Sequence, residues 1–160
     1  LSIPVDVIEQ LSHHPNIVGA KDSEFDLERL KALMTAVGNR ADFSVLVGVS
    51  SLALDAMRLG ADGIVPSPAH LVPKSCSALY ACGRTGDIEH MPLYQAHINE
   101  VSAICNRGRS LGQSLAALKA AMGELGLCGP AMLYPLRALP KEEQEAARRA
   151  YRDWRSLVRA

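Results

Sequence analysis

The chain has 160 residues, and its 17 lysines and arginines balance its 17 aspartates and glutamates, so its formal net charge at pH 7 is zero. Proteins that bind nucleic acid or anionic membrane surfaces concentrate basic residues on one face, and the balanced charge argues against both roles. No apolar run approaches the ~20 residues that span a bilayer, and no charged-then-apolar start marks a signal peptide. We therefore expect a cytoplasmic protein.

Short apolar strands and helices alternate in the first half of the chain. Each expected strand is a brief apolar run without alternation of polarity, which is typical of a strand buried on both faces. Helical spacing of apolar residues, with Asp26 as a cap and Gly38 and Gly60 as stops, predicts the helices. The expected strands cover residues 17–20, 43–48 and 63–65, and the expected helices cover residues 4–12, 26–38, 51–59 and 73–82, the last followed by Gly83.

From residue 87 onward the pattern predicts helices only, over residues 87–106, 113–125 and 141–158. Strands that alternate with helices at the earlier spacing specify parallel βαβ units, and we count three. A closed (β/α)8 barrel needs eight units and typically ~250 residues. We therefore expect an α/β fold that is a partial TIM (β/α)8 barrel: residues 1–83 form its last three strand-helix units, and residues 84–160 form a C-terminal helical extension of the same domain. The first five units are missing from such a fragment.

Lys21 follows the first apolar run directly, and its chemistry needs an explanation. Side chains alternate along a strand, so Ile17, Gly19 and Lys21 share one face. If this face points into a closed barrel, the amine lies at the carboxyl end of the strand, where such folds place their chemistry. Burial penalises the charged form, and a neutral amine attacks ketones to form a Schiff base. The alternative is a structural lysine that extends from the strand end into solvent.

The sequence contains no pattern typical of a metal site or a disulfide framework. The four cysteines form no Cys-x-x-Cys pair and lie within apolar helical patterns, so we expect reduced core residues. The histidines lack the spacing that converges ligands on a metal. The cysteines are Cys76, Cys82, Cys105 and Cys128.

Three segments stand in a recognisable order and spacing: Gly19-Ala20-Lys21-Asp22-Ser23, Leu46-Val47-Gly48, and Leu59-Gly60-Ala61-Asp62-Gly63-Ile64-Val65. With the helices that follow, they resemble the C-terminal half of a subunit of the dihydrodipicolinate synthase and N-acetylneuraminate lyase family. The resemblance implies a (β/α)8 barrel with added C-terminal helices, usually a homotetramer, that uses no metal or organic cofactor. It also implies a Schiff-base-forming (class I) aldolase or lyase that acts on pyruvate or another 2-keto acid together with an aldehyde.

The resemblance gives roles to four residues. Lys21 matches the Schiff-base lysine, whose protonated imine accepts electrons when a carbon-carbon bond breaks or forms. Gly48 matches a glycine that leaves room beside the imine, and Val65 matches a position whose backbone faces the pyruvate portion. Ser50 lies where sugar-acid lyases place a residue that contacts substrate hydroxyls, although it is equally explained as the N-cap of the following helix.

Departures from the family pattern bear on the substrate. Val49 and Ser50 replace the acidic pair that usually follows the pocket glycine in dihydrodipicolinate synthases, His70 stands where asparagine is common, and Phe25 stands where glycine is common. These differences argue against lysine biosynthesis and favour a sugar-derived keto acid. The family's proton-shuttling tyrosine and its threonine-rich loop for the pyruvate carboxylate come from the N-terminal half, so we expect this fragment alone to be inactive and the full-length protein to be a lyase.

Two other functions stay open. Residues 60–65 also resemble the turn of barrels that bind phosphate through late loops, although Pro66 and Pro68 lack the N–H donors that such a loop needs. A non-catalytic relative that serves as a binding or assembly subunit is the other alternative. The presence of Lys21 argues against it, because a buried lysine without chemistry is destabilising.

Overall fold

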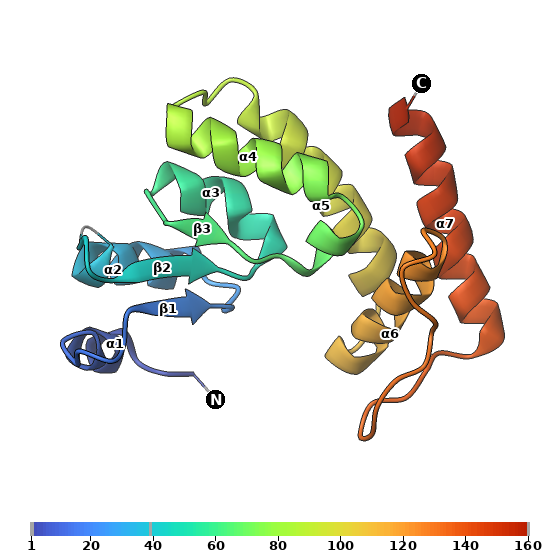
Figure 1. The fold of residues 1–160 in the computed structure, drawn as a ribbon, viewed down its shortest axis with the longest axis horizontal. Helices are drawn as coiled ribbons and strands as arrows, with labels where there is room; N and C mark the ends of the chain where they lie inside the picture. Colours follow the sequence, from blue (N-terminus) through green and yellow to red (C-terminus); the bar gives the residue numbers. More distant parts are fainter. Residues whose placement is uncertain (1, 39, 160) are drawn as a thin grey trace.

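A computed structural model describes residues 2–38 and 40–159 of the chain. Within them, three strands form one parallel sheet, and helices surround it and extend beyond it (Figure 1). The strands are β1 (Gly19–Asp22), β2 (Ser44–Val47) and β3 (Gly63–Ile64), in that order across the sheet. The helices are α1 (Val5–Leu11), α2 (Leu27–Val37), α3 (Ala53–Arg58), α4 (Pro73–Thr85), α5 (Met91–Asn106), α6 (Leu111–Gly123) and α7 (Lys141–Arg159), with two 3-10 helices, η1 (Ser50–Leu52) and η2 (Ser67–His70).

The three predicted strand-helix units and the parallel pairing of their strands are confirmed. The register of the sheet decides which side chains share a face. Lys21 is the partner of Leu46, which is in turn the partner of Gly63. Side chains two residues apart point the same way, so Gly48 and Val65 continue the face that carries Lys21. All three arrowheads point toward the side of the molecule that holds α6 (Figure 1). The carboxyl ends of the strands therefore meet α5 and α6.

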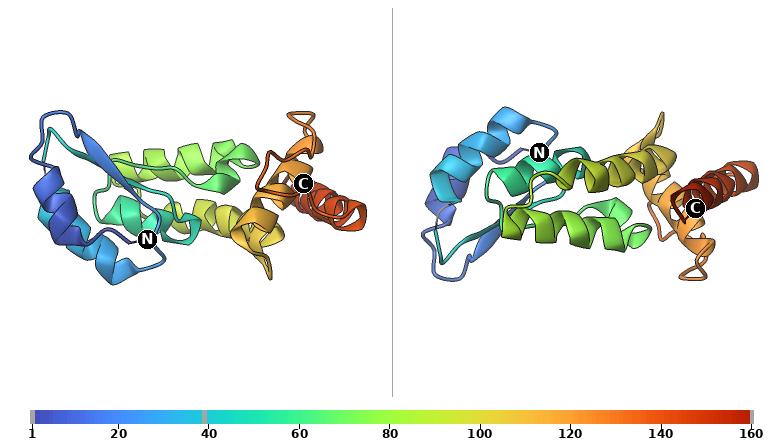
Figure 2. Two further views of the ribbon diagram at one scale, coloured as in Figure 1. Left: turned by 90° about the horizontal axis from the view of Figure 1, so that it is seen from below. Right: turned by 90° about the horizontal axis from the view of Figure 1, so that it is seen from above.

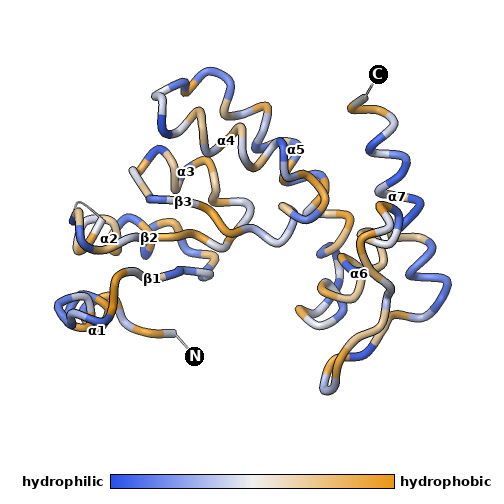
Figure 3. The backbone as a smooth tube through the Cα atoms, in the orientation of Figure 1, coloured by the Kyte–Doolittle hydropathy of each residue, from blue (hydrophilic) through white to orange (hydrophobic). Residues whose placement is uncertain are grey.

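The opposite face of the sheet is covered by α2 and α3. Val45 and Val47 of β2 are buried there with Leu30, Leu33 and Ala56. Asp26 caps α2, since its side chain accepts a hydrogen bond from the backbone N–H of the third helical residue. Figure 3 shows hydrophobic colour along β2 and hydrophilic colour where β1 ends. One hydrophobic core of the molecule therefore lies between β2 and the helices α2 and α3.

A second core joins α4, α5, α6 and α7. Figure 2 shows α4 beside α5, with α1 and α2 at one end of the molecule and α6 and α7 at the other. Buried alanines of α6, such as Ala117 and Ala121, allow α7 to pack closely. The hydroxyl of the buried Tyr151 on α7 donates a hydrogen bond to the carbonyl of Leu71 at 2.8 Å. This core fixes the helices that face the strand ends.

Several boundaries differ from the sequence-based expectation: α5 begins at Met91 rather than at residue 87, α6 lies two residues earlier than predicted, and the bounds of β1 and α4 change as well. β1 lies two residues later than predicted and includes Lys21, because its hydrogen bonds to β2 run from Val18 to Asp22. Gly83 does not end α4, which continues to Thr85 and stops at Gly86, where φ is +77°. A Cβ at Gly83 would lie 2.7 Å from Cβ of Met57, so this glycine allows α3 and α4 to approach. The boundary predicted between residues 83 and 84 therefore falls inside a helix.

Both outer edges of the sheet lack a strand partner within the described residues. The edge beside β1 is apolar: Val18 is 70% exposed, and Phe25 after the strand is 84% exposed. Unpaired edges and exposed large apolar side chains are normally covered in soluble proteins. None of the helices in the described part of the chain is long and apolar enough to cross a membrane.

Candidate active site

Lys21, Gly48 and Val65 come together at the carboxyl ends of the three strands, as their shared parity predicts. A Cβ at Gly48 would lie 2.7 Å from Cε of Lys21 and would clash with Oγ of Ser23. The lysine stem therefore passes directly over the glycine backbone. Gly48 donates its N–H to the carbonyl of Asp22 at 2.7 Å, and Val65 donates its N–H to the carbonyl of Val47 at 2.8 Å. These bonds extend the sheet to the level of the amine.

The side chain of Lys21 is exposed in this chain, whereas its burial was expected for a closed barrel. β1 is an edge strand of the sheet. The side chain of Lys21 also takes part in no hydrogen bond or ion pair with any other described residue. The amine is therefore presented at the strand end without a carboxylate that would hold it.

The neighbouring Asp22 points to the opposite face and is neutralised there. Its side chain is buried, and Oδ2 lies 3.0 Å from Nε of Arg29 on α2. Oδ1 accepts a hydrogen bond from the backbone N–H of Glu24 at 2.8 Å. The strand thus places the charges of Lys21 and Asp22 on opposite faces of the sheet. Only Lys21 lies on the face that α2 and α3 do not cover.

Ser50 does not cap the helix that follows it. η1 begins at Ser50 itself, and its N-cap, Val49, makes no side-chain capping bond. The Ser50 hydroxyl instead lies 3.0 Å from the hydroxyl of Ser102 on α5. The Ser102 hydroxyl also accepts a hydrogen bond from the Asn106 side chain at 2.9 Å. The capping interpretation is wrong, and Ser50 belongs to a polar row that continues along α5.

Gln95 is a residue of this region that the sequence analysis missed. Its side chain is 92% buried, and the amide makes three hydrogen bonds. Oε1 accepts from the N–H of Leu54 at 2.7 Å, and Nε2 donates to the carbonyl of Ser50 and to Oδ1 of Asn99, both at 2.8 Å. Gln95 therefore fixes the turn after Gly48 against α5. The available signal was an amide within the apolar stripe of that helix.

All four predicted site residues line one cavity of about 800 Å³. The strand ends and the turns after them supply Lys21, Gly48, Ser50 and Val65. Helices α5 and α6, with the turn between them, supply the remaining polar wall, which the sequence analysis did not foresee: Ser102, Asn106, Arg109 and Ser114. A second cavity of about 720 Å³ runs along β1, between α1 and α2, and also reaches Lys21.

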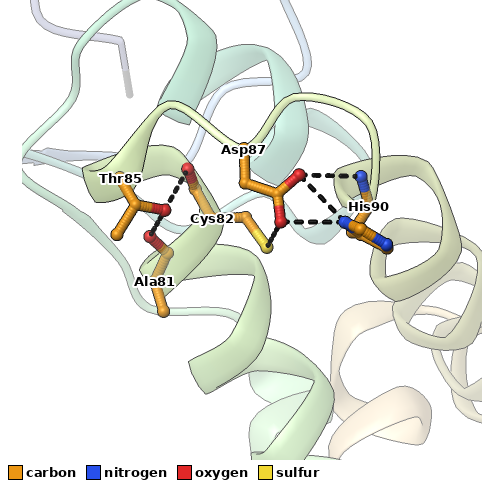
Figure 4. Close-up of polar contacts among 5 residues, drawn as sticks. All are labelled: Ala81, Cys82, Thr85, Asp87 and His90. Atoms are coloured by element: carbon orange, nitrogen blue, oxygen red, sulfur yellow. Dashed lines mark hydrogen bonds and ion pairs between the residues drawn. The ribbon is translucent and has the colours of Figure 1, made fainter.

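Cys82, Asp87 and His90 form a separate cluster between α4 and α5 (Figure 4). The Asp87 carboxylate accepts from the Cys82 thiol at 3.9 Å and lies 2.8 and 2.9 Å from Nδ1 of His90. Burial and the charge of Asp87 raise the pKa of the thiol. The hydrogen bond with Asp87 raises the pKa of His90, and the same bond lowers the pKa of Asp87. Because the carboxylate stands between the thiol and the ring, the cluster holds the turn and does not activate a nucleophile.

The described cysteines form no disulfide, and three of them are buried as expected. Cys128 is only partly buried. Among residues 2–38 and 40–159, no group of three or more His, Cys, Asp or Glu side chains could hold a metal ion.

Comparison with known proteins identifies the family. The profile described as the dihydrodipicolinate synthetase family matches residues 1–153. This chain belongs to that family. A 4-hydroxy-tetrahydrodipicolinate synthase of Stutzerimonas stutzeri is 33% identical over 147 residues, which cover 92% of this chain and 48% of the relative. The Pseudomonas aeruginosa protein of the same name is 31% identical over 155 residues, with 92% and 48% covered.

Solved structures of the family share the fold. A dihydrodipicolinate synthase from Bacteroides thetaiotaomicron superimposes with a TM-score of 0.85 at 26% identity, covering 96% of this chain and 52% of the other. A prophage protein of the family from E. coli K12, solved with pyruvate, gives a TM-score of 0.81 at 18% identity and covers 94% and 51%, so it supports the fold alone. The chain spans about half the length of the relatives that it matches.

Proposed function

We propose that the chain forms the last three strand-helix units of a (β/α)8 barrel enzyme, a pyruvate-dependent class I aldolase or lyase, in which Lys21 forms the Schiff base. One observation carries the proposal: the Lys21 stem crosses Gly48 at the carboxyl end of a parallel sheet and enters a cavity there. Barrel enzymes place their chemistry at this end of their strands. Membership of the dihydrodipicolinate synthetase family supports the same reaction class.

In the proposed reaction, the neutral Lys21 amine attacks the ketone carbon of pyruvate, and the adduct loses water to give an imine. The protonated imine withdraws electrons from the adjacent carbon. That carbon loses a proton, and the imine becomes an enamine. The enamine attacks an aldehyde, whose oxygen takes up a proton, and water then releases the 4-hydroxy-2-keto acid. The reverse sequence cleaves the same carbon-carbon bond. Gly48 contributes the space that the imine needs, and the backbone of Val65 faces the pyruvate portion of the keto acid.

A sugar-derived keto acid is the proposed substrate. The chain has Val49 and Ser50 after the pocket glycine, and the Ser50 hydroxyl lines the cavity rather than capping a helix. The relatives in the sequence comparison are named 4-hydroxy-tetrahydrodipicolinate synthase. A hydroxyl at this position suits a hydroxylated substrate, since it can both donate and accept hydrogen bonds.

The exposed amine of Lys21 bears on the rest of the full-length protein. A lysine becomes a good nucleophile when burial disfavours its charged form, and this chain leaves it exposed. The proposal therefore includes further strands that pair with the free edges of β1 and β3, cover the amine and supply a proton-shuttling tyrosine and a carboxylate-binding loop. In this proposal residues 1–83 and the last turn of α4 belong to the barrel, and the helices after α4 form an extension. The full-length protein is a cytoplasmic homotetramer without a cofactor, and the 160 residues alone are inactive.

The test uses the full-length protein, incubated with pyruvate and reduced with borohydride, followed by peptide mass analysis. We expect a pyruvyl adduct on Lys21, and none on the exposed Lys31 of α2, which serves as an internal control. The Lys21→Arg variant, with unchanged thermal unfolding, should lose the adduct. No adduct, or adducts spread over surface lysines, would refute the aldolase and favour a phosphate-binding barrel or a non-catalytic relative.

A further inference from the structure

Phe25 is a large apolar side chain that lies beside Lys21 and is left in water. Its exposed fraction is 84%, although it lines the cavity at the strand ends. It also lines the second cavity, along β1, and the residues common to both cavities are Lys21, Ser23 and Phe25. An exposed phenylalanine forgoes the hydrophobic stabilisation that burial of its ring gives. The ring therefore stands at the boundary of the two cavities, next to the amine.

The turn that carries Phe25 is fixed on both sides of this residue. The backbone N–H of Glu24 donates to Oδ1 of Asp22 at 2.8 Å. Oδ1 of Asp26 accepts from the backbone N–H of Arg29 at 3.0 Å, and the Arg29 side chain in turn pairs with Asp22. No described residue other than glycine has a positive φ, so the turn is free of left-handed backbone strain. These bonds hold the backbone of Phe25 in place and leave its ring on the cavity side.

The rim across the cavity is apolar as well. Leu111, the first residue of α6, lines the same cavity and is 78% exposed. Single exposed apolar residues are ordinary in soluble proteins, but Phe25 and Leu111 line one concave site. A compound bound covalently to Lys21 occupies this site, so its presence removes apolar surface from water.

An imine on Lys21 is open to a side reaction that competes with the proposed chemistry. Water adds to the imine carbon, a proton moves to the nitrogen, and the carbon-nitrogen bond breaks, which regenerates the amine and the keto acid. The enamine forms from the same imine, so this hydrolysis competes with attack on the aldehyde. Exclusion of water from a site prevents the hydrolysis of reactive intermediates. In the turn after β1, the large apolar side chain placed to exclude water is that of Phe25.

We propose that the Phe25 ring closes over the imine formed at Lys21 and excludes water from the imine carbon. This inference rests on the proposed function, because it concerns the intermediate of that reaction. The ring gains apolar contact with the bound keto acid, and this gain lengthens the lifetime of the imine. In the free protein the ring stays exposed, as it is in this structure. Phe25 contacts the adduct and neither donates nor accepts a proton.

The first experiment needs no variant. The full-length protein is exposed to hydroxyl radicals, once with free Lys21 and once after pyruvate has been fixed on Lys21 with borohydride, and the oxidation of each side chain is measured by peptide mass analysis. We expect Phe25 to be oxidised readily in the free protein and to lose most of this reactivity in the adduct. Leu133 is the control, because it is 89% exposed and lines neither cavity. Its oxidation should not change.

Variants then measure the lifetime of the imine. Lactate dehydrogenase and NADH remove free pyruvate, and borohydride added at intervals traps the adduct that remains on Lys21. We expect Phe25→Ala to lose the adduct about 10-fold faster, at the lower end of the effect of burying a phenylalanine side chain. The rate of adduct formation should change much less, because the ring closes only after the imine exists. Phe25→Leu, which stays apolar, should restore most of the lifetime, and Leu133→Ala should match the wild type.

The outcomes separate the shielding role from the aldolase. A Lys21 adduct that leaves Phe25 oxidation unchanged, or that has a wild-type lifetime in a folded Phe25→Ala variant, overturns the shielding role and leaves the aldolase intact. A Phe25 that is already unreactive in the free protein, or an equal effect of Leu133→Ala, overturns it as well. The absence of a wild-type adduct refutes the aldolase and the shielding role with it.

Discussion

Replacing Gly48 with alanine tests whether the space under Lys21 matters for chemistry or only for folding. The added Cβ would lie 2.7 Å from Cε of Lys21, so the lysine must retreat by about 1 Å to regain an ordinary carbon-carbon contact. The other close neighbour is the hydroxyl of Ser23, also part of a side chain. Since both neighbours can rotate away, we expect the free energy of unfolding to fall by only about 1 kcal/mol.

The effect on the reaction should be much larger. A displacement of about 1 Å in a reacting group can reduce the rate about 100-fold. We expect Gly48→Ala in the full-length protein to lower the rate of borohydride-trapped adduct formation on Lys21 by about that factor, measured by mass spectrometry over time. Gly129→Ala is the control, because no atom lies within 4 Å of a Cβ at that position. A wild-type adduct rate, or a loss of stability of several kcal/mol, would refute this account of Gly48.

Three further predictions concern residues that hold the site in place. Gln95→Leu leaves the N–H of Leu54 and the carbonyl of Ser50 without their buried partner, so urea unfolding should show a loss of about 2–4 kcal/mol, whereas the exposed Gln10→Leu should show almost none. Gly83→Ala forces a methyl against a methionine Cβ of α3, and the overpacking should outweigh the better helix propensity of alanine, for a net loss of about 1 kcal/mol by the same assay. The Asp87–His90 pair should protect the turn before α5 best between roughly pH 4 and 6.5. The raised pKa of His90 means that its contribution is lost as the pH rises through that value, and the lowered pKa of Asp87 means that its contribution is lost as the pH falls through its own. Amide exchange at residues 88–91 measures this, and a pH-independent rate after correction for intrinsic exchange would contradict it.

The local pattern of residues was enough to predict the helices and strands and the face of the sheet that carries the candidate site. The apolar runs located all three strands, and the caps located helices such as α2, because these features depend on residues close together in the sequence. Strand parity then placed Lys21, Gly48 and Val65 on one side, and the register of the sheet agrees. The shift of β1 was not predictable, since its bounds depend on where β2 pairs with it.

Contacts between distant segments account for what the sequence analysis missed. Gln95 is 41 residues from the backbone N–H that it accepts from, and nothing near it in the sequence marks this partner. The polar wall of the cavity has the same origin, because α5 and α6 reach the strand ends only after the chain has folded. Gly83 was misinterpreted for a related reason: a glycine that ends a helix and a glycine that admits a neighbouring helix look alike in a sequence.

The charges of Lys21 and Asp22, which are neighbours in β1, lie on opposite faces of the sheet. Side-chain alternation sends Asp22 to the α2 face, where Arg29 neutralises it, and leaves Lys21 on the cavity face. If Asp22 lay on the cavity face, its negative charge would oppose the positive charges of Lys21 and Arg109 there. With the acid turned away, the charged side chains that line the cavity among the described residues are those of Lys21 and Arg109. Strand parity, which the sequence alone reveals, therefore decides the sign of the charge on the cavity face.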